Sequence, residues 1–128
     1  MIVDTSALVA VVFRERGHDA LITKLAASTG SGIGTPTLAE LGVVLSARLD
    51  ADPQSLITRL LVEFDLEPVP FGDEHWREAA AAFRRFGRGR HKARLNFGDC
   101  LSYSVARLAD EPLLFVGDDF AATDLVAA

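Results

Sequence analysis

Acidic residues stand at four separated points of the chain: Asp4, Glu40, Asp99 and the adjacent pair Asp118 and Asp119. Two carboxylates about 4 Å apart repel by roughly 4 kcal/mol at an effective dielectric of about 20. If the fold gathers these residues, they need a counter-ion, and a set of oxygen ligands favours Mg²⁺ or Mn²⁺ over softer metals. A metal site of this kind activates water for attack on phosphoryl esters.

The first of these residues follows a short apolar segment. Met1 to Val3 predicts a buried strand, and Asp4-Thr5-Ser6 ends it and caps a helix that runs to about Phe13. Asp4 then lies at the carboxyl end of a strand, where open parallel sheets collect their ligands. Helix capping alone is the alternative explanation for Asp4.

Strands and helices alternate along the rest of the chain. A second helix around Leu21 and Leu25 is predicted to end in the small-residue stretch Ser28 to Gly34, and Thr35 is predicted to cap a helix running from Pro36 to Leu49. This alternation predicts an α/β fold with a parallel sheet and right-handed crossovers. Further predicted elements are helices around residues 56–64 and 76–83 and after residue 96, and strands at 67–69 and 113–116.

Glu40 stands inside an apolar helix. Between residues 36 and 49 the only ionisable residues are Glu40 and Arg48, and Val43, Val44 and Ala47 share the face of Glu40. An isolated carboxylate on such a face costs several kcal/mol unless it is paired or bound to a metal. Both a metal ligand and a buried salt bridge to an arginine fit this position.

The later acidic residues begin or follow predicted elements. Asp99 comes three residues after Asn96, a spacing that predicts a capping box, and a carboxylate at a helix start can also face a metal. Asp118, Asp119 and Asp124 surround Phe120, and we expect at most two of the three to reach a common site.

Length and composition limit the kinds of protein that this chain can be. A chain of 128 residues with 49% hydrophobic content predicts one folded domain over residues 1–128. The longest apolar run, Ala7 to Phe13, is too short to span a bilayer, and the first residues lack a basic leader, so we expect a cytoplasmic protein with no membrane contact. The single cysteine, Cys100, excludes an internal disulfide and is expected to pack inside a helix layer.

Positive charge is concentrated in one segment. The net charge of −5 argues against a general nucleic-acid binder, yet six of the thirteen Lys and Arg residues fall between Arg84 and Arg94. The segment from Gly87 to Leu95 is interpreted as a flexible basic loop that contacts phosphates, with a solvated surface loop as the alternative. Its candidate RNA-binding residues are Arg88, Arg90, Lys92 and Arg94.

Four short motifs occur in a fixed order. They are Ile2-Val3-Asp4-Thr5-Ser6-Ala7, Thr35-Pro36-Thr37-Leu38-Ala39-Glu40, Asn96-Phe97-Gly98-Asp99-Cys100, and Val116-Gly117-Asp118-Asp119-Phe120 followed by Thr123-Asp124. With these motifs the chain resembles, over nearly its whole length, a PIN-domain ribonuclease of the VapC toxin type. The resemblance implies a PIN-like three-layer α/β/α sandwich with a central parallel sheet, and RNA cleavage that depends on Mg²⁺ or Mn²⁺. It also implies a homodimer and inhibition by a small VapB-type antitoxin.

The resemblance assigns roles to individual residues. Asp4, Glu40 and Asp99 match the first three acidic positions of the family, and Ser6 matches a small polar residue near the metal. The fourth position stays open between Asp118 and Asp119, because Val116 replaces the usual threonine before it.

These roles lead to a mechanistic hypothesis. Asp4 and Asp99 hold a first metal directly, while Glu40 and Asp118 or Asp119 bind through water or complete a second site. A metal-activated water then attacks RNA and leaves 5′-phosphate and 3′-hydroxyl ends. The main rival is a catalytically silent PIN-like scaffold that binds RNA or protein. A receiver-type phosphotransfer domain and a haloacid-dehalogenase-like phosphatase are disfavoured, because the acidic and lysine residues they need are missing.

The resemblance also leads to an expectation for the antitoxin. We expect it to place an arginine among the carboxylates. We further expect an amphipathic antitoxin helix along the first two helices, near Val9, Val12, Leu21 and Leu25.

Overall fold

Four parallel strands form the centre of the computed structural model, which describes residues 1–128. The strands lie in the order β3-β2-β1-β4, with Ile2 of β1 paired to Gly32 on one side and to Leu113 on the other. Consecutive strands that pair with each other are joined by helices, because two parallel strands need a crossover connection. The strands are β1 (Ile2–Val3), β2 (Ser31–Gly34), β3 (Leu66–Val69) and β4 (Leu113–Leu114).

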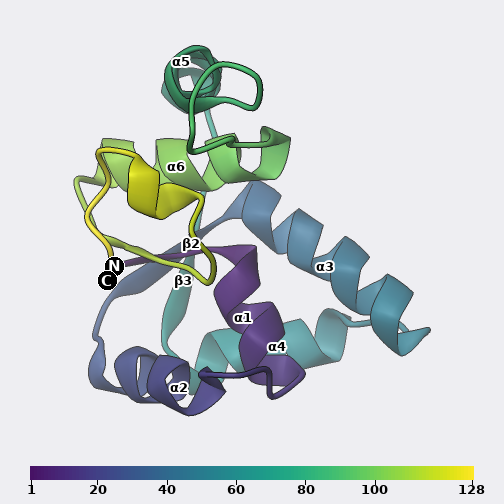
Figure 1. Cartoon of the computed structure of the whole chain (residues 1–128). Coiled ribbons are helices and arrows are strands. Elements are labelled where there is room, and N and C mark those ends of the chain that lie inside the picture. The colour runs from purple at the N-terminus through teal and green to yellow at the C-terminus, as the bar shows by residue number, and fades with distance from the viewer.

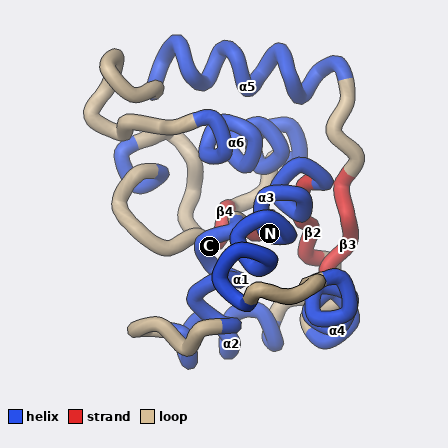
Figure 2. The backbone as a smooth tube through the Cα atoms, turned by 90° about the vertical axis from the view of Figure 1, so that its right-hand side faces the viewer, coloured by secondary structure: helices blue, strands red, loops and turns tan.

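Helices cover both faces of this sheet, which confirms the predicted α/β/α arrangement (Figure 1). One face carries α1 (Thr5–Val12), α2 (His18–Ala27), α3 (Thr35–Leu49) and α4 (Gln54–Glu63). The other carries α6 (Phe97–Ala109), and α5 (Asp73–Phe86) packs on the outside of α6 (Figure 2). A short 3₁₀ helix, η1 (Phe120–Ala122), follows β4. No helix is long and apolar enough to cross a membrane.

Two hydrophobic cores arise from the alternation of side chains along the strands. Val3 and Leu114 point into the core shared with α1 to α4, whereas their neighbours Ile2 and Leu113 point into the core shared with α5 and α6. All four side chains are buried. The sequence of a strand that is buried on both faces is a short continuous apolar run, and this pattern allowed β1 and β4 to be predicted.

The second strand was not predicted. Residues 28–34 were expected to be a break, but Ser31–Gly34 is a buried strand between β1 and β3. A Cβ atom on Gly32 would lie 2.8 Å from Val69 Cγ2, and one on Gly34 would lie 2.9 Å from Val105 Cγ2. The glycines allow β3 and α6 to pack closely against β2, and they also remove the apolar pattern that identifies a strand.

Two smaller expectations were also wrong. Thr35 is the first residue of α3 rather than its cap, since the N-cap is Gly34 and no side chain caps this helix. The last strand ends at Leu114, before Val116. Of the residues proposed to lie near an antitoxin helix, Leu21 and Leu25 are buried in the core, while Val9 and Val12 are half-buried and pack against it. The position of the antitoxin helix stays a prediction.

Candidate active site

The carboxyl ends of β1 and β4 define the candidate site. The chain proceeds outward from β1 through β2 to β3, and then returns to place β4 on the other side of β1. This reversal of direction is the point at which open parallel sheets bind ligands. Asp4 follows β1 directly, and the segment containing Asp118 and Asp119 follows β4.

Asp4 is buried and fully hydrogen-bonded. Its side chain is 5% exposed, and its Oδ2 accepts hydrogen bonds from the backbone N–H of Ser6 at 3.0 Å and from Ser6 Oγ at 2.6 Å. Its Oδ1 accepts a hydrogen bond from Ser102 Oγ at 2.6 Å. The predicted helix cap is confirmed, and the additional hydroxyl contacts orient both carboxylate oxygens.

Hydroxyl groups connect Asp4 to its surroundings. Because the single proton of Ser102 Oγ is donated to Asp4, Thr37 Oγ1 must donate its own proton in the 3.2 Å contact with Ser102. Ser6 Oγ donates to Asp4 and accepts from the backbone N–H of Val116 at 3.0 Å. Ser6 therefore joins the end of β1 to the segment after β4.

Glu40 receives a hydrogen bond from a neighbouring helix. Thr5 Oγ1 donates to Glu40 Oε1, which joins α3 to the start of α1. None of the salt bridges in the structure involves Glu40, so the arginine alternative is wrong. Arg48, the other charged residue of this helix, lies over the Phe13 ring at 3.7 Å from its centroid.

The second oxygen of Glu40 lies against the first turn of α6. A Cβ atom on Gly98 would overlap Glu40 Oε2 and would lie 3.1 Å from its Cδ. Any side chain at position 98 would therefore displace this carboxylate. Gly98 is a positioning residue, since its missing side chain leaves the space that Glu40 occupies beside Asp99.

Asp99 caps a helix and is half-buried near other carboxylates. Its Oδ2 accepts from the backbone N–H of Asn96 at 3.0 Å, and Asn96 Oδ1 accepts from the N–H of Asp99 at 2.8 Å, which confirms the predicted capping box. Burial raises the pKa of Asp99 to about 6, the Asn96 hydrogen bond opposes the shift, and the charges of Asp4, Asp119 and Glu40 raise it further.

The three aspartates around Phe120 separate into different environments. Asp118 and Asp119 are both exposed, and of the two only the charge of Asp119 contributes to the raised pKa of Asp99. Asp124 Oδ1 accepts a 2.7 Å hydrogen bond from Tyr103 Oη, and its Oδ2 lies 3.4 Å from Arg85 Nη2. The carboxylate of Asp124 is therefore engaged by these two residues rather than by the candidate site. Although burial raises the pKa of Asp124, the Tyr103 hydrogen bond and Arg85 together lower it.

The structure brings Asp4, Glu40, Asp99 and Asp119 into one electrostatic cluster without a protein cation. No salt bridge reaches any of the four. The donor set fits a hard divalent ion, because it consists of carboxylate and hydroxyl oxygens only. No three acidic, histidine or cysteine side chains converge closely enough to ligate one ion directly in this arrangement. Asp4, Glu40 and Asp99 each accept hydrogen bonds from their own donors instead.

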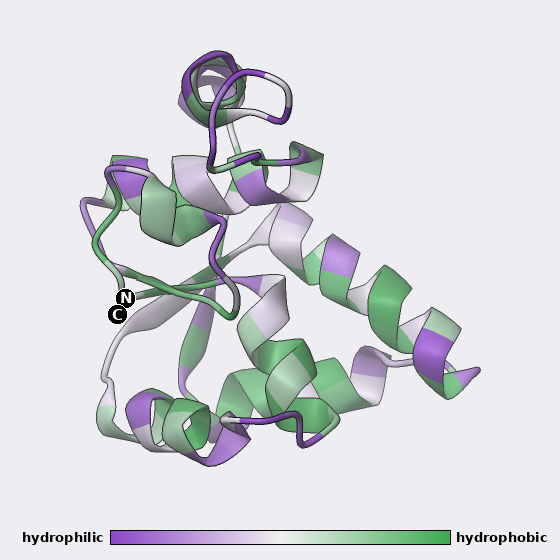
Figure 3. Ribbon diagram, viewed as in Figure 1, coloured by the Kyte–Doolittle hydropathy of each residue, from purple (hydrophilic) through white to green (hydrophobic).

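The basic segment is anchored at its base rather than loose. Arg88 N–H donates to Leu95 O at 3.0 Å, and Leu95 N–H donates to Phe86 O at 3.0 Å, so the two ends are held together. Ala93 and Leu95 are buried, whereas the cationic side chains are exposed. Figure 3 shows the strongly hydrophilic colouring of this loop at the end of α5. The exposed residues are Arg88, Arg90, Lys92 and Arg94.

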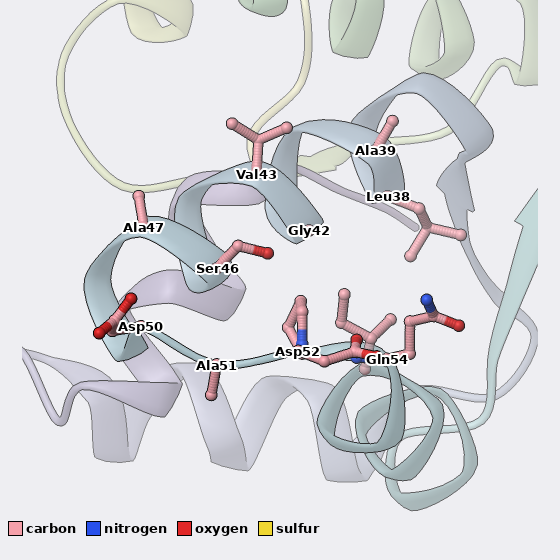
Figure 4. A pocket seen from close by; sticks show the side chains of 12 residues that line it. Leu38, Ala39, Gly42, Val43, Ser46, Ala47, Asp50, Ala51, Asp52 and Gln54 are labelled. Atoms are coloured by element: carbon pink, nitrogen blue, oxygen red, sulfur yellow. The ribbon is translucent and has the colours of Figure 1, made fainter.

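The largest cavity lies away from these carboxylates. It has a volume of about 970 Å³ and lies between the second half of α3 and the start of α4, where Val43, Ala47 and Asp52 line it (Figure 4). A smaller cavity of about 590 Å³, which shares Ala39 and Val43 of α3 with the first, includes Glu40 and Gly98 in its wall. The second cavity is therefore the one connected to the candidate chemistry.

Four supporting residues escaped the sequence-based search: Thr5, Thr37, Ser102 and Gly98. The sequence spacing of two of these residues, Ser102 and Thr37, could have identified them. Ser102 follows Asp99 by three residues and Thr37 precedes Glu40 by three, so each hydroxyl lies one helical turn from an acidic residue. For Thr5 and Gly98 the relevant neighbour is Glu40, which is distant in sequence.

Comparisons with known proteins converge on one family. The family model described as PIN domain matches residues 1–125. Ribonuclease VapC36 of Mycobacterium tuberculosis is 46% identical over 126 residues, which cover 98% of this chain and 91% of that protein. Ribonuclease VapC42 of the same species is 42% identical with coverage of 98% and 96%, and Ribonuclease VapC of Mycolicibacterium smegmatis is 34% identical with coverage of 99% and 98%.

Solved structures show the same fold at lower sequence identity. The crystal structure of Mycobacterium tuberculosis VapC20, described as a toxin that cleaves the sarcin-ricin loop, has a TM-score of 0.80 at 18% identity and covers 99% of this chain and 97% of its own. A chain of a toxin-antitoxin complex from Klebsiella pneumoniae has a TM-score of 0.73 at 17% identity, with coverage of 99% and 95%.

Proposed function

We propose, on the basis that this chain belongs to the PIN-domain family and to its VapC ribonucleases, that it hydrolyses RNA phosphodiester bonds as the toxin of a type II toxin-antitoxin pair. The observation that supports this best is the cluster of Asp4, Glu40, Asp99 and Asp119 at the sheet edge. Three neighbouring carboxylates act on Asp99, and no arginine or lysine compensates them. A bound divalent cation would relieve the repulsion among these carboxylates, which supports the proposal.

The proposal gives each residue of the cluster a separate role. Asp4 and Asp99 would hold Mg²⁺ or Mn²⁺ directly, with Glu40 and Asp119 or Asp118 contributing through water. The bound ion supplies Lewis acidity that lowers the pKa of a water molecule. Ser6 and Ser102 keep both oxygens of Asp4 in fixed directions, and such supporting contacts commonly change metal affinity by about 10-fold to 100-fold.

Metal binding and RNA end chemistry test this function together. Calorimetric titration of the parent with Mn²⁺ should show a specific site that is absent in Asp99→Asn. Purified parent protein with Mn²⁺ should cleave RNA and leave 5′-phosphate and 3′-hydroxyl ends, because a water nucleophile leaves the 2′-hydroxyl unused. A silent scaffold would show neither the Mn²⁺ site nor cleavage, and 2′,3′-cyclic phosphate ends would contradict the proposed nucleophile.

A VapB-type antitoxin is the proposed protein partner. Its inhibitory contact is an arginine that pairs with the carboxylates in place of the metal. Mn²⁺ and the antitoxin should therefore compete, and calorimetry with the cognate antitoxin measures this directly. Equal antitoxin affinity with and without saturating Mn²⁺ would place inhibition elsewhere. A homodimer is also proposed, and sedimentation of the purified protein tests it.

A further inference from the structure

The segment after β4 carries Asp119 on a short hydrogen-bonded turn. Asp119 is the N-cap of η1, and Thr123 ends it, because the N–H and the Oγ1 of Thr123 both donate to Phe120 O. Phe120 is only 3% exposed, and its ring centroid lies 5.2 Å from that of Phe115. Asp119 and Asp124 therefore flank the same turn, and a contact that holds Asp124 also limits the movement of Asp119.

A buried tyrosine of α6 holds Asp124. Tyr103 is fully buried, and its Oη donates to Asp124 Oδ1 at 2.7 Å, so the C-terminal segment, yellow in Figure 1, is fastened to α6. Burial raises the pKa of Tyr103, and the hydrogen bond to Asp124 raises it further, so the hydroxyl keeps its proton and stays a donor. Hydrogen bonds to a charged acceptor are about twice as strong as neutral ones.

The same tyrosine packs against the base of the basic loop. Phe86 is the last residue of α5, and its ring centroid lies 5.7 Å from that of Tyr103 and 5.1 Å from that of His91 inside the loop. Arg85 adds a second contact, since its guanidinium lies 4.7 Å from the Phe86 ring centroid and 3.4 Å from Asp124 Oδ2. The Asp119 segment and the basic loop thus share one support.

We propose that Arg85, Tyr103 and Asp124, which we call the C-terminal anchor, hold the Asp119 segment and the basic loop in a fixed relation that RNA cleavage requires. This inference rests on the proposed function. The anchor consists of positioning residues, because it acts through the groups that the two segments carry. A displacement of about 1 Å can cost about 100-fold in rate, so a carboxylate and an RNA-binding loop from different parts of the chain need a common support.

Two substitutions break the anchor, and a third is the matched control. Tyr103→Phe removes one hydroxyl and keeps the buried ring, whereas Asp124→Ala removes both contacts of the carboxylate. The control is Asp110→Asn, which also loses one negative charge. Asp110 lines the same cavity of about 170 Å³ as Asp124, but it takes part in no salt bridge. Its left-handed conformation, with a φ of 53°, suits Asn.

Amide hydrogen exchange in chelator tests the anchor without metal or RNA. The reporters are the N–H of Val116, which donates to Ser6 Oγ, and the N–H of Arg88, which closes the basic loop. In Tyr103→Phe and Asp124→Ala both amides should exchange about 10-fold faster than in the parent, the order expected when one hydrogen bond to a charged group is lost. Amides inside α1 should keep the parent's rates, and the control variant should exchange like the parent throughout.

Cleavage with Mn²⁺ tests whether this support matters for the reaction. Tyr103→Phe should lower kcat by about 10-fold, because the Asp119 segment and the loop lose their common reference. Its RNA affinity in chelator should stay within about twofold of the parent's with the same salt dependence, since no cationic side chain is altered. A tyrosine needed only for folding would instead lower kcat and the number of RNA-binding sites together.

Several outcomes would overturn the inference. Parent-like exchange of Val116 and Arg88 in both anchor variants would mean that the anchor holds neither segment. Equal acceleration over the whole chain, α1 included, would make Tyr103 a stability residue only. Faster exchange with an unchanged kcat would refute the positioning role and leave the proposed function intact. A parent that neither binds Mn²⁺ nor cleaves RNA refutes the proposed function and, with it, the catalytic role of the anchor.

Discussion

The acidic sheet edge and the basic loop both concentrate like charges, but their surroundings differ. At the sheet edge, Asp4 is buried and Asp99 is half-buried, and burial together with the charge of Asp4 raises the pKa of Asp99. In the loop, Arg88 and Arg94 extend into solvent, where repulsion is screened over about 8 Å. Burial makes like charges at the sheet edge costly in the absence of the proposed metal, whereas exposure leaves the cationic side chains of the loop free to attract a polyanion.

The hydrogen bonds of the two regions also differ. The acidic side chains accept bonds from Thr5, Ser6 and Ser102, so their directions are fixed by side-chain donors. The basic loop is held by its backbone at Phe86, Arg88 and Leu95, and its cationic side chains have few contacts of their own. Chemistry needs fixed groups, whereas attraction of RNA needs only net charge.

The largest expected effect comes from neutralising the acidic edge. Asp4→Asn and Asp99→Asn should each lower RNA cleavage by about 100-fold or more, because each removes a direct metal ligand. The two variants should differ in stability. Asp99→Asn keeps an oxygen for its cap and loses repulsion, whereas Asp4→Asn loses an acceptor among buried hydroxyl donors.

Denaturant unfolding in chelator checks this division. The parent is the reference, and Asp99→Asn should unfold at equal or higher denaturant while Asp4→Asn unfolds at lower denaturant. Cleavage by either variant at the parent's rate would remove that residue from the metal site.

Glu40→Gln tests a carboxylate held by one hydroxyl. Activity should fall at least about 10-fold, because a charged ligand becomes neutral. Stability should change by less than about 1 kcal/mol, since Gln can still accept from Thr5 and no buried ion pair is broken. Measurement of kcat and of the unfolding free energy on one preparation distinguishes this from a structural role. An active variant that is strongly destabilised would assign Glu40 to packing.

Gly98→Ala changes the position of Glu40 without altering any charge. The new Cβ collides with Glu40 Oε2, so cleavage and Mn²⁺ affinity should fall by about 10-fold while the fold is kept. The matched control is Gly42→Ala in α3, where the nearest atom is Ile57 Cδ1 at 3.8 Å. The control should retain activity and gain up to about 1 kcal/mol of stability from better helix propensity. Equal activity in both variants would contradict the positioning role of Gly98.

The pH dependence of stability reports on Asp99. Its pKa is about 6 in the folded protein against an ordinary value of 3.8, so the folded state holds this proton more tightly than the unfolded state. The resulting stabilisation is complete below about pH 3.8 and is lost as the pH rises through about 6. In chelator, the free energy of unfolding of the parent should therefore fall over this range relative to Asp99→Asn. Parallel pH profiles for the two proteins would show that Asp99 is not responsible.

The smallest effect on turnover is expected from the basic loop. Replacing Arg88, Arg90, Lys92 and Arg94 by Ala should weaken RNA binding and flatten its salt dependence, because the logarithmic slope falls by about 0.7 for each lost phosphate contact on a single strand. The rate at saturating RNA should stay near that of the parent. Filter binding over a range of salt concentrations measures the slope. An unchanged slope would make the loop an ordinary solvated surface.

Local sequence patterns were sufficient to predict most of the elements and the acidic positions. The apolar run before Asp4, the spacing of Asn96 and Asp99, and the lone Glu40 in an apolar helix each express a rule that acts within a few residues. The same rules did not predict β2, where Gly32 and Gly34 leave room for side chains that are distant in sequence. A strand defined by close packing has no hydrophobic pattern of its own.

Only the tertiary structure decided how the site is assembled. The reversal of strand order brings Asp4 beside the segment after β4, and Ser102 reaches Asp4 across 98 positions of sequence. The sequence left Asp118 and Asp119 equivalent as candidates, and in the structure the charge of Asp119 contributes to the raised pKa of Asp99. Residue type and local spacing determine which groups can carry charge or cap a helix, but electrostatic coupling depends on distance through space, which the crossovers of the chain establish.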